Sequence, residues 1–382
     1  MKRIKGGCPS CLLFPTLIMV IAVCLAGIAG CDKKEQPIKI GFVGGLTGRF
    51  SDLDTSGRNG VLLAIEQINR AGGIHGRPVE LIIKDDRHDP REALRVDQEL
   101  IDEGVVAIIG HMASAMSTAV LPLINKEKIL MVSPTTSTDQ LTGIDDYFIR
   151  VMPSNKAEAD YLARYAYSEM GIKKIAAVYD LANRAYTEGF LDNFRRAFER
   201  LGGKVIFAEP YTSGEGTDFA EVAVSLIRPY PDAVLVVAGS LDAAMICQHI
   251  RMNRATLPIF SCGWAMTDAF VKHGGPAVEG VMFSQLFDEK CQDRRYVTFK
   301  RKYKERFGEE PDFAAVHGYE AAGVILKVLS KNSDPETLKA TLLKQRIFQG
   351  VQGDFNLDAY GDPQRRRILI TVKGGAFQRK HN

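Results

Sequence analysis

The sequence predicts an α/β fold with two doubly wound lobes, each built on a parallel central sheet, joined by a multi-strand hinge. Three observations indicate this fold. Apolar, β-branched runs alternate with amphipathic segments along most of the chain. About 350 residues follow the N-terminal leader, more than one hydrophobic core normally serves. The alternation is also interrupted near residues 146–154, where an extended stretch precedes a new series of β/α units.

Nine apolar runs are expected to form the strands of the two sheets. They cover residues 38–43, 79–84, 105–110, 129–133, 175–179, 205–208, 233–237, 258–261 and 281–284. The segment 91–103 illustrates the helices between them, because Asp89 suits the cap, Pro90 suits the first turn, and Ala93, Val96 and Leu100 share one face. Continuous apolar strands that alternate with helices are typical of parallel sheets covered on both faces.

The chain is expected to cross between the lobes several times. One crossing is predicted at residues 146–154 and another after residues 284–287, and the tail from Phe348 is expected to form short strands and turns. These crossings give an N-terminal lobe of residues 38–153 plus 287–360 and a C-terminal lobe of residues 154–286 plus 361–378. Lobes joined in this way can open and close around a cleft.

The first 30 residues have the pattern of an export signal. Lys2, Arg3 and Lys5 precede an uncharged apolar run at residues 12–26. Small residues then lead directly to Cys31, which resembles a lipobox, so cleavage after residue 30 and a lipid on Cys31 are expected. Residues 31–37 would form a tether that holds the protein at the outer face of the cytoplasmic membrane, in the periplasm or at the cell surface. A plain secretory peptide with a chance cysteine is the alternative.

Charge and cysteine content exclude some classes of protein. The chain has 49 basic and 46 acidic residues. Loss of the three basic residues of the leader would balance the charges, which disfavours a nucleic-acid partner. Only Cys247, Cys262 and Cys291 lie outside the leader and tether. Three cysteines allow one disulfide at most, so a disulfide-built scaffold is not expected.

No catalytic or cofactor motif is found. The segment 44–48 lacks the three spaced glycines of a dinucleotide-binding turn, although Asp85 stands where a ribose-binding acid would. The seven histidines form no His-Glu-x-x-His pair, and a Gly-x-Ser-x-Gly elbow is absent. We therefore expect no enzyme activity, no cofactor and no metal.

A series of short motifs carries a family resemblance over residues 38–374. The motifs lie at residues 41–48, 69–76, 85–86, 110–114, 133–137, 211–219, 348–350 and 353–355. In order and spacing they resemble the type I periplasmic binding proteins of the leucine/isoleucine/valine-binding kind. The resemblance implies a monomeric receptor that binds a small amino-acid-like ligand and serves the permease and ATPase subunits of an ABC importer. A sensing receptor of the same fold is the alternative.

Hydroxyl side chains follow two neighbouring predicted strands. Ser114 comes after the third strand, and Thr135 and Ser137 come after the fourth, at the sheet edge where open α/β folds bind ligands. The resemblance implies that Ser114 and Ser137 hold a ligand carboxylate, that the Thr135 carbonyl and the Ser137 hydroxyl take its ammonium group, and that Ala115 belongs to the same set. Ordinary helix caps and turns are the other interpretation.

The second lobe supplies the remaining candidates. Tyr186 matches the tyrosine that closes over the ligand in the family, although a rim tyrosine without this role has the same pattern. Family members that bind amino acids place a glutamate after the strand at 258–261, but this chain has Gly263 and Trp264 there. Trp264 is then either a cleft wall or a core residue. Asp242 could replace the missing charge or simply begin a helix, and a ligand that lacks an α-amine stays open.

Overall fold

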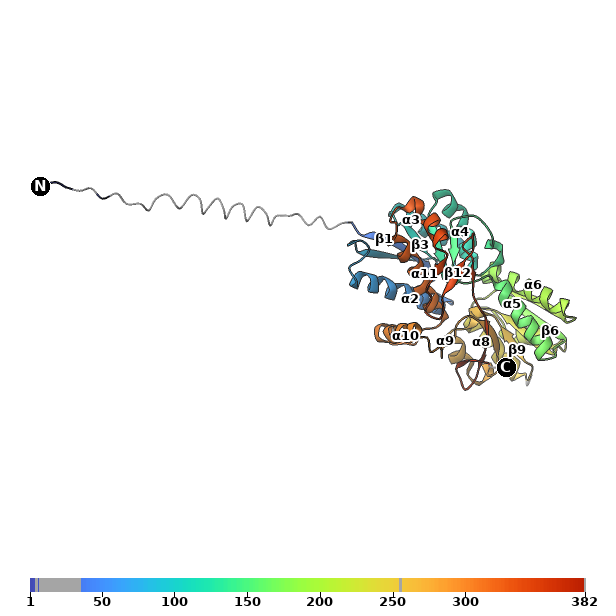
Figure 1. Ribbon diagram of the computed structural model, residues 1–382. Helices are drawn as coiled ribbons and strands as arrows, with labels where there is room; N and C mark the ends of the chain where they lie inside the picture. The colour runs from blue at the N-terminus through green and yellow to red at the C-terminus, as the bar shows by residue number, and fades with distance from the viewer. Residues whose placement is uncertain (4–5, 7–35, 254–255, 381–382) are drawn as a thin grey trace. The chain divides into compact units, whose positions relative to one another are not determined.

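The computed structural model describes residues 1–3, 6, 36–253 and 256–380, and its folded unit runs from Pro37 to Asn382. Residues 7–30 of the predicted leader, Cys31 and the tether up to residue 35 lie outside the described residues. Within the folded unit, two α/β lobes are each built on a central sheet (Figure 1). The predicted fold class is confirmed.

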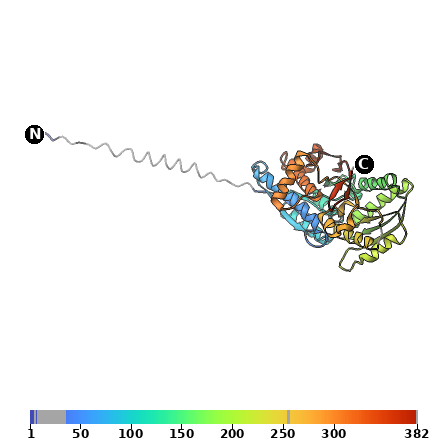
Figure 2. The same cartoon turned by 90° about the horizontal axis from the view of Figure 1, so that it is seen from below.

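The first lobe contains a five-stranded parallel sheet in the order β2-β1-β3-β4-β5. Its strands are β1 (Ile38–Gly44), β2 (Val79–Asp85), β3 (Ala107–Ile109), β4 (Leu130–Ser133) and β5 (Phe148–Arg150). Its helices are α2 (Ser51–Arg70), α3 (Pro90–Asp102), α4 (Ser114–Glu127), α10 (Arg294–Phe307), α11 (Phe313–Leu329) and α12 (Leu338–Gln345). In Figure 2 the orange helices α10 and α11 lie beside the blue helix α2, so the lobe is assembled from distant parts of the chain.

The second lobe contains a seven-stranded sheet in the order β15-β14-β10-β9-β8-β6-β7. Its strands are β6 (Lys174–Asp180), β7 (Lys204–Tyr211), β8 (Ala233–Val237), β9 (Ile259–Ser261), β10 (Met282–Gln285), β14 (Ile368–Val372) and β15 (Phe377–Arg379). Its helices are α5 (Asn155–Arg164), α6 (Arg184–Arg200), α7 (Phe219–Ile227), α8 (Ser240–Met252) and α9 (Asp268–Gly274). The first five strands by sequence are parallel, whereas β14 and β15 add an antiparallel edge.

Both faces of each central sheet are covered, as the apolar strands predicted. Every residue of β8 is buried. Val234 and Val236 join one apolar cluster, while Leu235 packs in the cluster on the opposite face. A strand buried on both sides cannot alternate apolar with polar residues, which explains its continuous apolar sequence.

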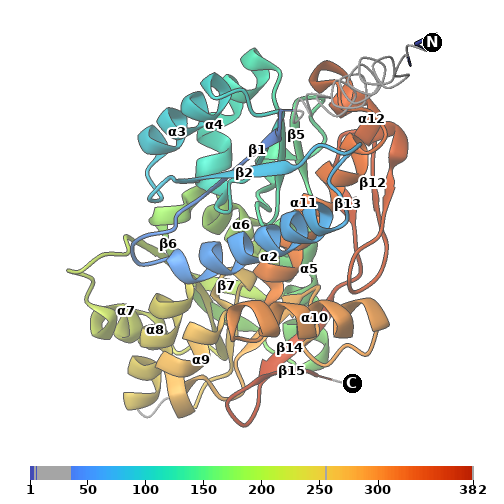
Figure 3. The same cartoon turned by 90° about the vertical axis from the view of Figure 1, so that its left-hand side faces the viewer.

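The chain passes between the lobes at three places. It leaves the first sheet at β5 and enters α5, returns from β10 to α10, and runs from a small antiparallel sheet into β14. That small sheet consists of β11 (Ile347–Phe348), β12 (Phe355–Leu357) and β13 (Pro363–Gln364). Figure 3 shows β1, β2 and β5 above β7, β14 and β15, with α2 between the two groups of strands. The lobe boundaries at residues 153, 286 and 360 stay predictions.

The structure contains the strands and the helix start that short stretches of the sequence predicted. All nine predicted strands form, with ends that differ by a few residues. Asp89 caps α3, accepting hydrogen bonds from the amides of Arg91 and Glu92 at 2.7 and 3.2 Å. In the described part of the chain the three cysteines are free, and none of its helices is both long and apolar enough to cross a bilayer.

Candidate ligand-binding site

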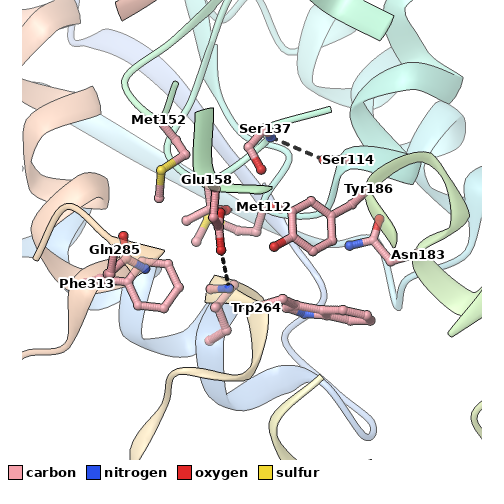
Figure 4. A pocket seen from close by; sticks show the side chains of 13 residues that line it. Met112, Ser114, Ser137, Met152, Glu158, Asn183, Tyr186, Trp264, Gln285 and Phe313 are labelled. Atoms are coloured by element: carbon pink, nitrogen blue, oxygen red, sulfur yellow. Dashed lines mark hydrogen bonds between the residues drawn. The ribbon is translucent and has the colours of Figure 1, made fainter. Parts of the chain in front are cut away.

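A small cavity lies between the lobes, at the carboxyl ends of strands from both sheets (Figure 4). Its lining residues are Leu53, Met112, Ser114, Thr135, Ser137, Met152, Glu158, Asn183, Tyr186, Gly263, Trp264, Gln285 and Phe313. It holds about 380 Å³ of space between atoms, part of it continuous with solvent. The part of this space that can hold a water-sized sphere is only about 30 Å³, so the lining must move apart before a solute larger than one or two water molecules can enter.

Hydroxyl groups of the first lobe form one end of the cavity. Ser114 begins α4, and its Oγ accepts hydrogen bonds from the amides of Ser137 and Thr138, both at 3.2 Å. The Ser114 proton therefore stays available for a ligand acceptor. Thr135 Oγ1 donates to the carbonyl of Met112 at 2.5 Å, which fixes the turn after β4. This end offers donors to a carboxylate without a fixed cation.

The first turn of α4 meets the second lobe at this end. The amide of Ala115 donates to Asn183 Oδ1 at 3.1 Å, and the preceding N-cap residue Ala113 makes no side-chain hydrogen bond of its own. The positive end of a helix dipole and its unpaired amides attract negative groups. Asn183 thus occupies, from the opposite lobe, the place beside the helix start where an anionic ligand group is favoured.

Aromatic rings of the second lobe form a wall. The rings of Tyr186 and Trp264 meet edge to face with centroids 6.4 Å apart. Trp264 is partly buried, and its ring also lies beside that of Phe50 in the first lobe, with centroids 5.0 Å apart. Burial raises the pKa of the Tyr186 phenol well above its usual value, so the hydroxyl keeps its proton and can donate to a ligand.

A buried carboxylate from α5 also reaches the cavity. Glu158 Oε1 accepts a hydrogen bond from the amide of Gly263 at 2.6 Å. A Cβ atom at position 263 would stand 3.2 Å from both Glu158 Oε1 and Gln285 Nε2, so the glycine leaves room for the acid. Burial raises the pKa of Glu158, while Arg367 and the Gly263 amide oppose the rise.

Arg367 stands behind Glu158, close to the hinge. Its Nη1 lies 3.5 Å from Glu158 Oε2, and its guanidinium makes no hydrogen bond with the described residues. Burial lowers the pKa of Arg367, against the pull of Glu158. The two side chains form a loose ion pair that leaves the carboxylate with capacity for a further donor.

The family model for periplasmic binding proteins matches residues 37–376, nearly the whole folded unit. The chain belongs to this family. It is a type I periplasmic binding protein of the leucine/isoleucine/valine-binding kind, with the two-lobed fold that the motifs indicated. Family membership places it among solute-binding proteins that work outside the cytoplasm.

Relatives of this periplasmic binding protein cover almost its full length. A leucine-, isoleucine-, valine-, threonine- and alanine-binding protein of Pseudomonas aeruginosa is 24% identical over 347 residues, covering 89% of this chain and 91% of the relative. A leucine-binding protein of Thermotoga maritima superposes with a TM-score of 0.82 at 27% identity, covering 90% and 98% of the two chains. A solute-binding protein of Rhodopseudomonas palustris in complex with benzoate shares the fold at 19% identity, with a TM-score of 0.82 and coverage of 90% and 95%.

The cavity brings together most of the residues singled out in the sequence. Those that line it are Ser114, Thr135, Ser137, Tyr186, Gly263 and Trp264. Ala115 lies just outside and contributes its amide to the contact with Asn183. Trp264 is neither a fully buried core residue nor an isolated surface ring, because it faces the cavity and packs on both lobes.

Asp242 does not line the cavity, so the structure does not bring this candidate together with the others. It is fully buried. Its Oδ1 accepts from Arg49 at 2.6 Å and its Oδ2 from the Tyr211 hydroxyl at 3.1 Å. The acid beside the cavity is Glu158, which the sequence analysis missed. Its only signal is a glutamate in the first turn of a helix after a lobe crossing, and many exposed glutamates share that pattern.

Proposed function

We propose that this periplasmic binding protein is the substrate-binding component of an ABC importer and that it closes around a small amino acid in the interlobe cavity. One observation carries the proposal. Hydroxyl and amide donors lie at one end of the cavity, and the buried carboxylate of Glu158 also lines it. Much of the remaining lining is apolar. A zwitterion with a short apolar side chain complements this distribution of charge.

The proposed pose follows from the polar groups. Ser114 and Ser137 would bind the ligand carboxylate at the start of α4, where the helix dipole adds to their hydroxyls. Glu158 would accept from the ammonium group. The ligand side chain would then extend toward Met152 and Phe313, which Figure 4 shows on the side of the cavity away from Ser114.

Titration calorimetry with leucine and two truncated analogues tests the zwitterion. We expect leucine to bind, and 4-methylpentanoate, which lacks the amine, to bind about 10- to 150-fold more weakly, because a hydrogen bond to a charged group contributes about 1.5–3 kcal/mol. The amine 3-methylbutylamine, which lacks the carboxylate, should lose a similar factor. Equal affinity for leucine and 4-methylpentanoate would exclude an ammonium subsite.

The variant Glu158→Gln isolates the role of the acid. Glutamine keeps an oxygen for the Gly263 amide but has no charge, so leucine should lose affinity while 4-methylpentanoate should lose little or none. Glu188→Gln is a matched control, because Glu188 pairs with Arg184 on the exposed surface of α6. If both ligands weaken equally in Glu158→Gln, the acid acts on the fold and not on the ammonium group.

An aromatic carboxylate without an amine is the second candidate ligand. The observation in its favour is that Tyr186, Trp264 and Phe313 all line the cavity, because flat rings pack well between aromatic side chains. Benzoate is the probe. Tight binding of benzoate together with no binding of leucine would select this candidate over the amino acid.

A lipid on Cys31 would hold the domain at the cytoplasmic membrane beside the permease and ATPase of the importer. The lipobox pattern of the sequence supports this anchor. Labelling with a radioactive fatty acid should mark the wild type and leave Cys31→Ala unmarked, while both proteins bind the same ligand. Loss of solute uptake on deletion of the gene would support transport, whereas intact uptake with a lost transcriptional response would indicate sensing.

A further inference from the structure

Polar contacts between the lobes gather on one short segment beside the cavity. This covering segment, residues 49–53, lies at the start of α2 in the first lobe. Arg49 donates through Nε and Nη2 to Asp242 Oδ1 of the second lobe, both at 2.6 Å. Asp242 is fully buried, whereas 27% of the Arg49 side chain is exposed, so only the acid of the ion pair is fully withdrawn from bulk water.

Asp242 is also held by a residue of its own lobe. The Tyr211 hydroxyl donates to Asp242 Oδ2 at 3.1 Å, and both residues belong to the second lobe. The guanidinium of Arg49 also lies 5.5 Å from the ring centroid of Phe219 in the same lobe. The second lobe therefore presents a prepared receptor for a cation from the first.

The acid of the covering segment makes a contact of the opposite sense. Asp52 Oδ2 accepts hydrogen bonds from Ser240 Oγ at 2.7 Å and from Thr267 Oγ1 at 2.6 Å. Ser240 is the first residue of α8, so the carboxylate also lies near the positive end of a helix. At Arg49 the first lobe donates to the second, whereas at Asp52 the second lobe donates to the first.

The covering segment reaches the cavity through its apolar residues. Leu53 lines the cavity, and the ring of Phe50 packs on Trp264 with centroids 5.0 Å apart. A Cβ atom on Gly239 would come within 2.9 Å of the Phe50 ring, so this glycine allows the close approach. The charged contacts and the wall of the cavity are therefore parts of one short segment.

We propose that Arg49 and Asp52 are positioning residues for ligand binding, because they hold the lobes closed over the cavity without touching the ligand. Each finds its partner only when the lobes meet, and opening returns both to water. The covering segment should then populate the closed form even without ligand and slow the release of a bound ligand. The inference uses the proposed function only in that a solute binds this cavity.

Arg49→Gln and Asp52→Asn test the proposal in the ligand-free protein, so the result does not depend on which solute binds. We expect each variant to raise the ratio of open to closed forms about tenfold, which corresponds to about 1.4 kcal/mol. The radius of gyration from small-angle X-ray scattering should increase, and acrylamide should quench Trp264 more strongly because Phe50 no longer covers it. High salt should open the wild type further than it opens Arg49→Gln.

Arg184→Gln is the matched control, because Arg184 pairs with Glu188 within a single helix of the second lobe. It should leave scattering and quenching unchanged. Asp242→Asn should open the lobes as Arg49→Gln does, and the double variant should add little to either. Melting curves verify that each variant is folded. Scattering and quenching in Arg49→Gln and Asp52→Asn equal to those of Arg184→Gln would overturn the proposal, whatever the ligand screen gives.

Discussion

Replacement of Trp264 by alanine separates the energy of the closed site from the stability of the fold. The ring pairs with Tyr186 inside the second lobe and with Phe50 across the cleft. Each aromatic pair contributes about 0.5–1.5 kcal/mol. Loss of the contact with Tyr186 should therefore lower the free energy of unfolding. Loss of the contact with Phe50 should make closure of the lobes less favourable. Because the ring is only partly buried, the loss of stability should stay below the roughly 3–5 kcal/mol of a core tryptophan.

The expected affinity loss combines the cross-lobe pair with any contact to the ligand. A total of about 1–3 kcal/mol corresponds to a 5- to 150-fold higher dissociation constant. Calorimetry measures this directly with the solute found in the screen. In the wild type, the same titration should change the emission of Trp264, which is the only tryptophan of the chain, so the signal needs no separation from other residues.

Trp264→Phe is the control for the ring itself. It keeps an aromatic group against Phe50 and Tyr186, so its affinity should stay within a few-fold of the wild type. An emission that does not respond to a ligand proven by calorimetry, together with a collapse of the melting temperature in Trp264→Ala at unchanged affinity, would refute the reasoning. Trp264 would then be a structural residue of the second lobe.

Two further predictions concern buried polar groups. Ser114→Ala removes the acceptor of two amides, so we expect a loss of about 1–3 kcal/mol in unfolding free energy as well as weaker binding; urea unfolding and calorimetry measure the two, and unchanged values for both would contradict the hydrogen bonding. Burial raises the pKa of Asp312 to about 7, against hydrogen bonds from Ser56 and Ala315. A raised folded-state pKa means that stability is greatest below the unfolded pKa of about 3.9 and falls as pH rises toward 7. Asp312→Asn, which can still cap α11, should flatten that decline in urea unfolding at pH 4.5 and 8, and an equally steep decline in the variant would assign it to other groups.

The architecture could be predicted because its signals are local. Strand β8 consists only of apolar residues, which is typical of a strand covered on both faces. Asp89 followed by Pro90 marks the start of a helix, because the capping and the first turn depend only on these neighbouring residues. The hydroxyls after β3 and β4 could be placed together for a related reason, because neighbouring parallel strands end at the same edge. Each inference needed only a short stretch of sequence or one rule of topology.

The acid of the site could not be predicted, because its position depends on packing between distant segments. Glu158 and Asp242 both lie in the first turn of a helix, so the sequence gives no reason to prefer one over the other. Arg49, from a loop in the other lobe, engages Asp242. Glu158 is turned toward the cavity by the Gly263 amide, 105 positions further along the chain. Contacts of this range have no local signature.

Gly263 and Glu158 make sense only as a pair. The resemblance places an acid after β9, and the glycine there first indicates that the charge has been lost. A Cβ atom at 263 would come within 3.2 Å of Glu158 Oε1, and a carboxylate brought close to Glu158 on such a side chain would raise the pKa of one of the two acids. One acid therefore disfavours the other. An acid on α5 is accommodated best when the residue after β9 has no side chain, so a glycine at that position suits a charge supplied from elsewhere.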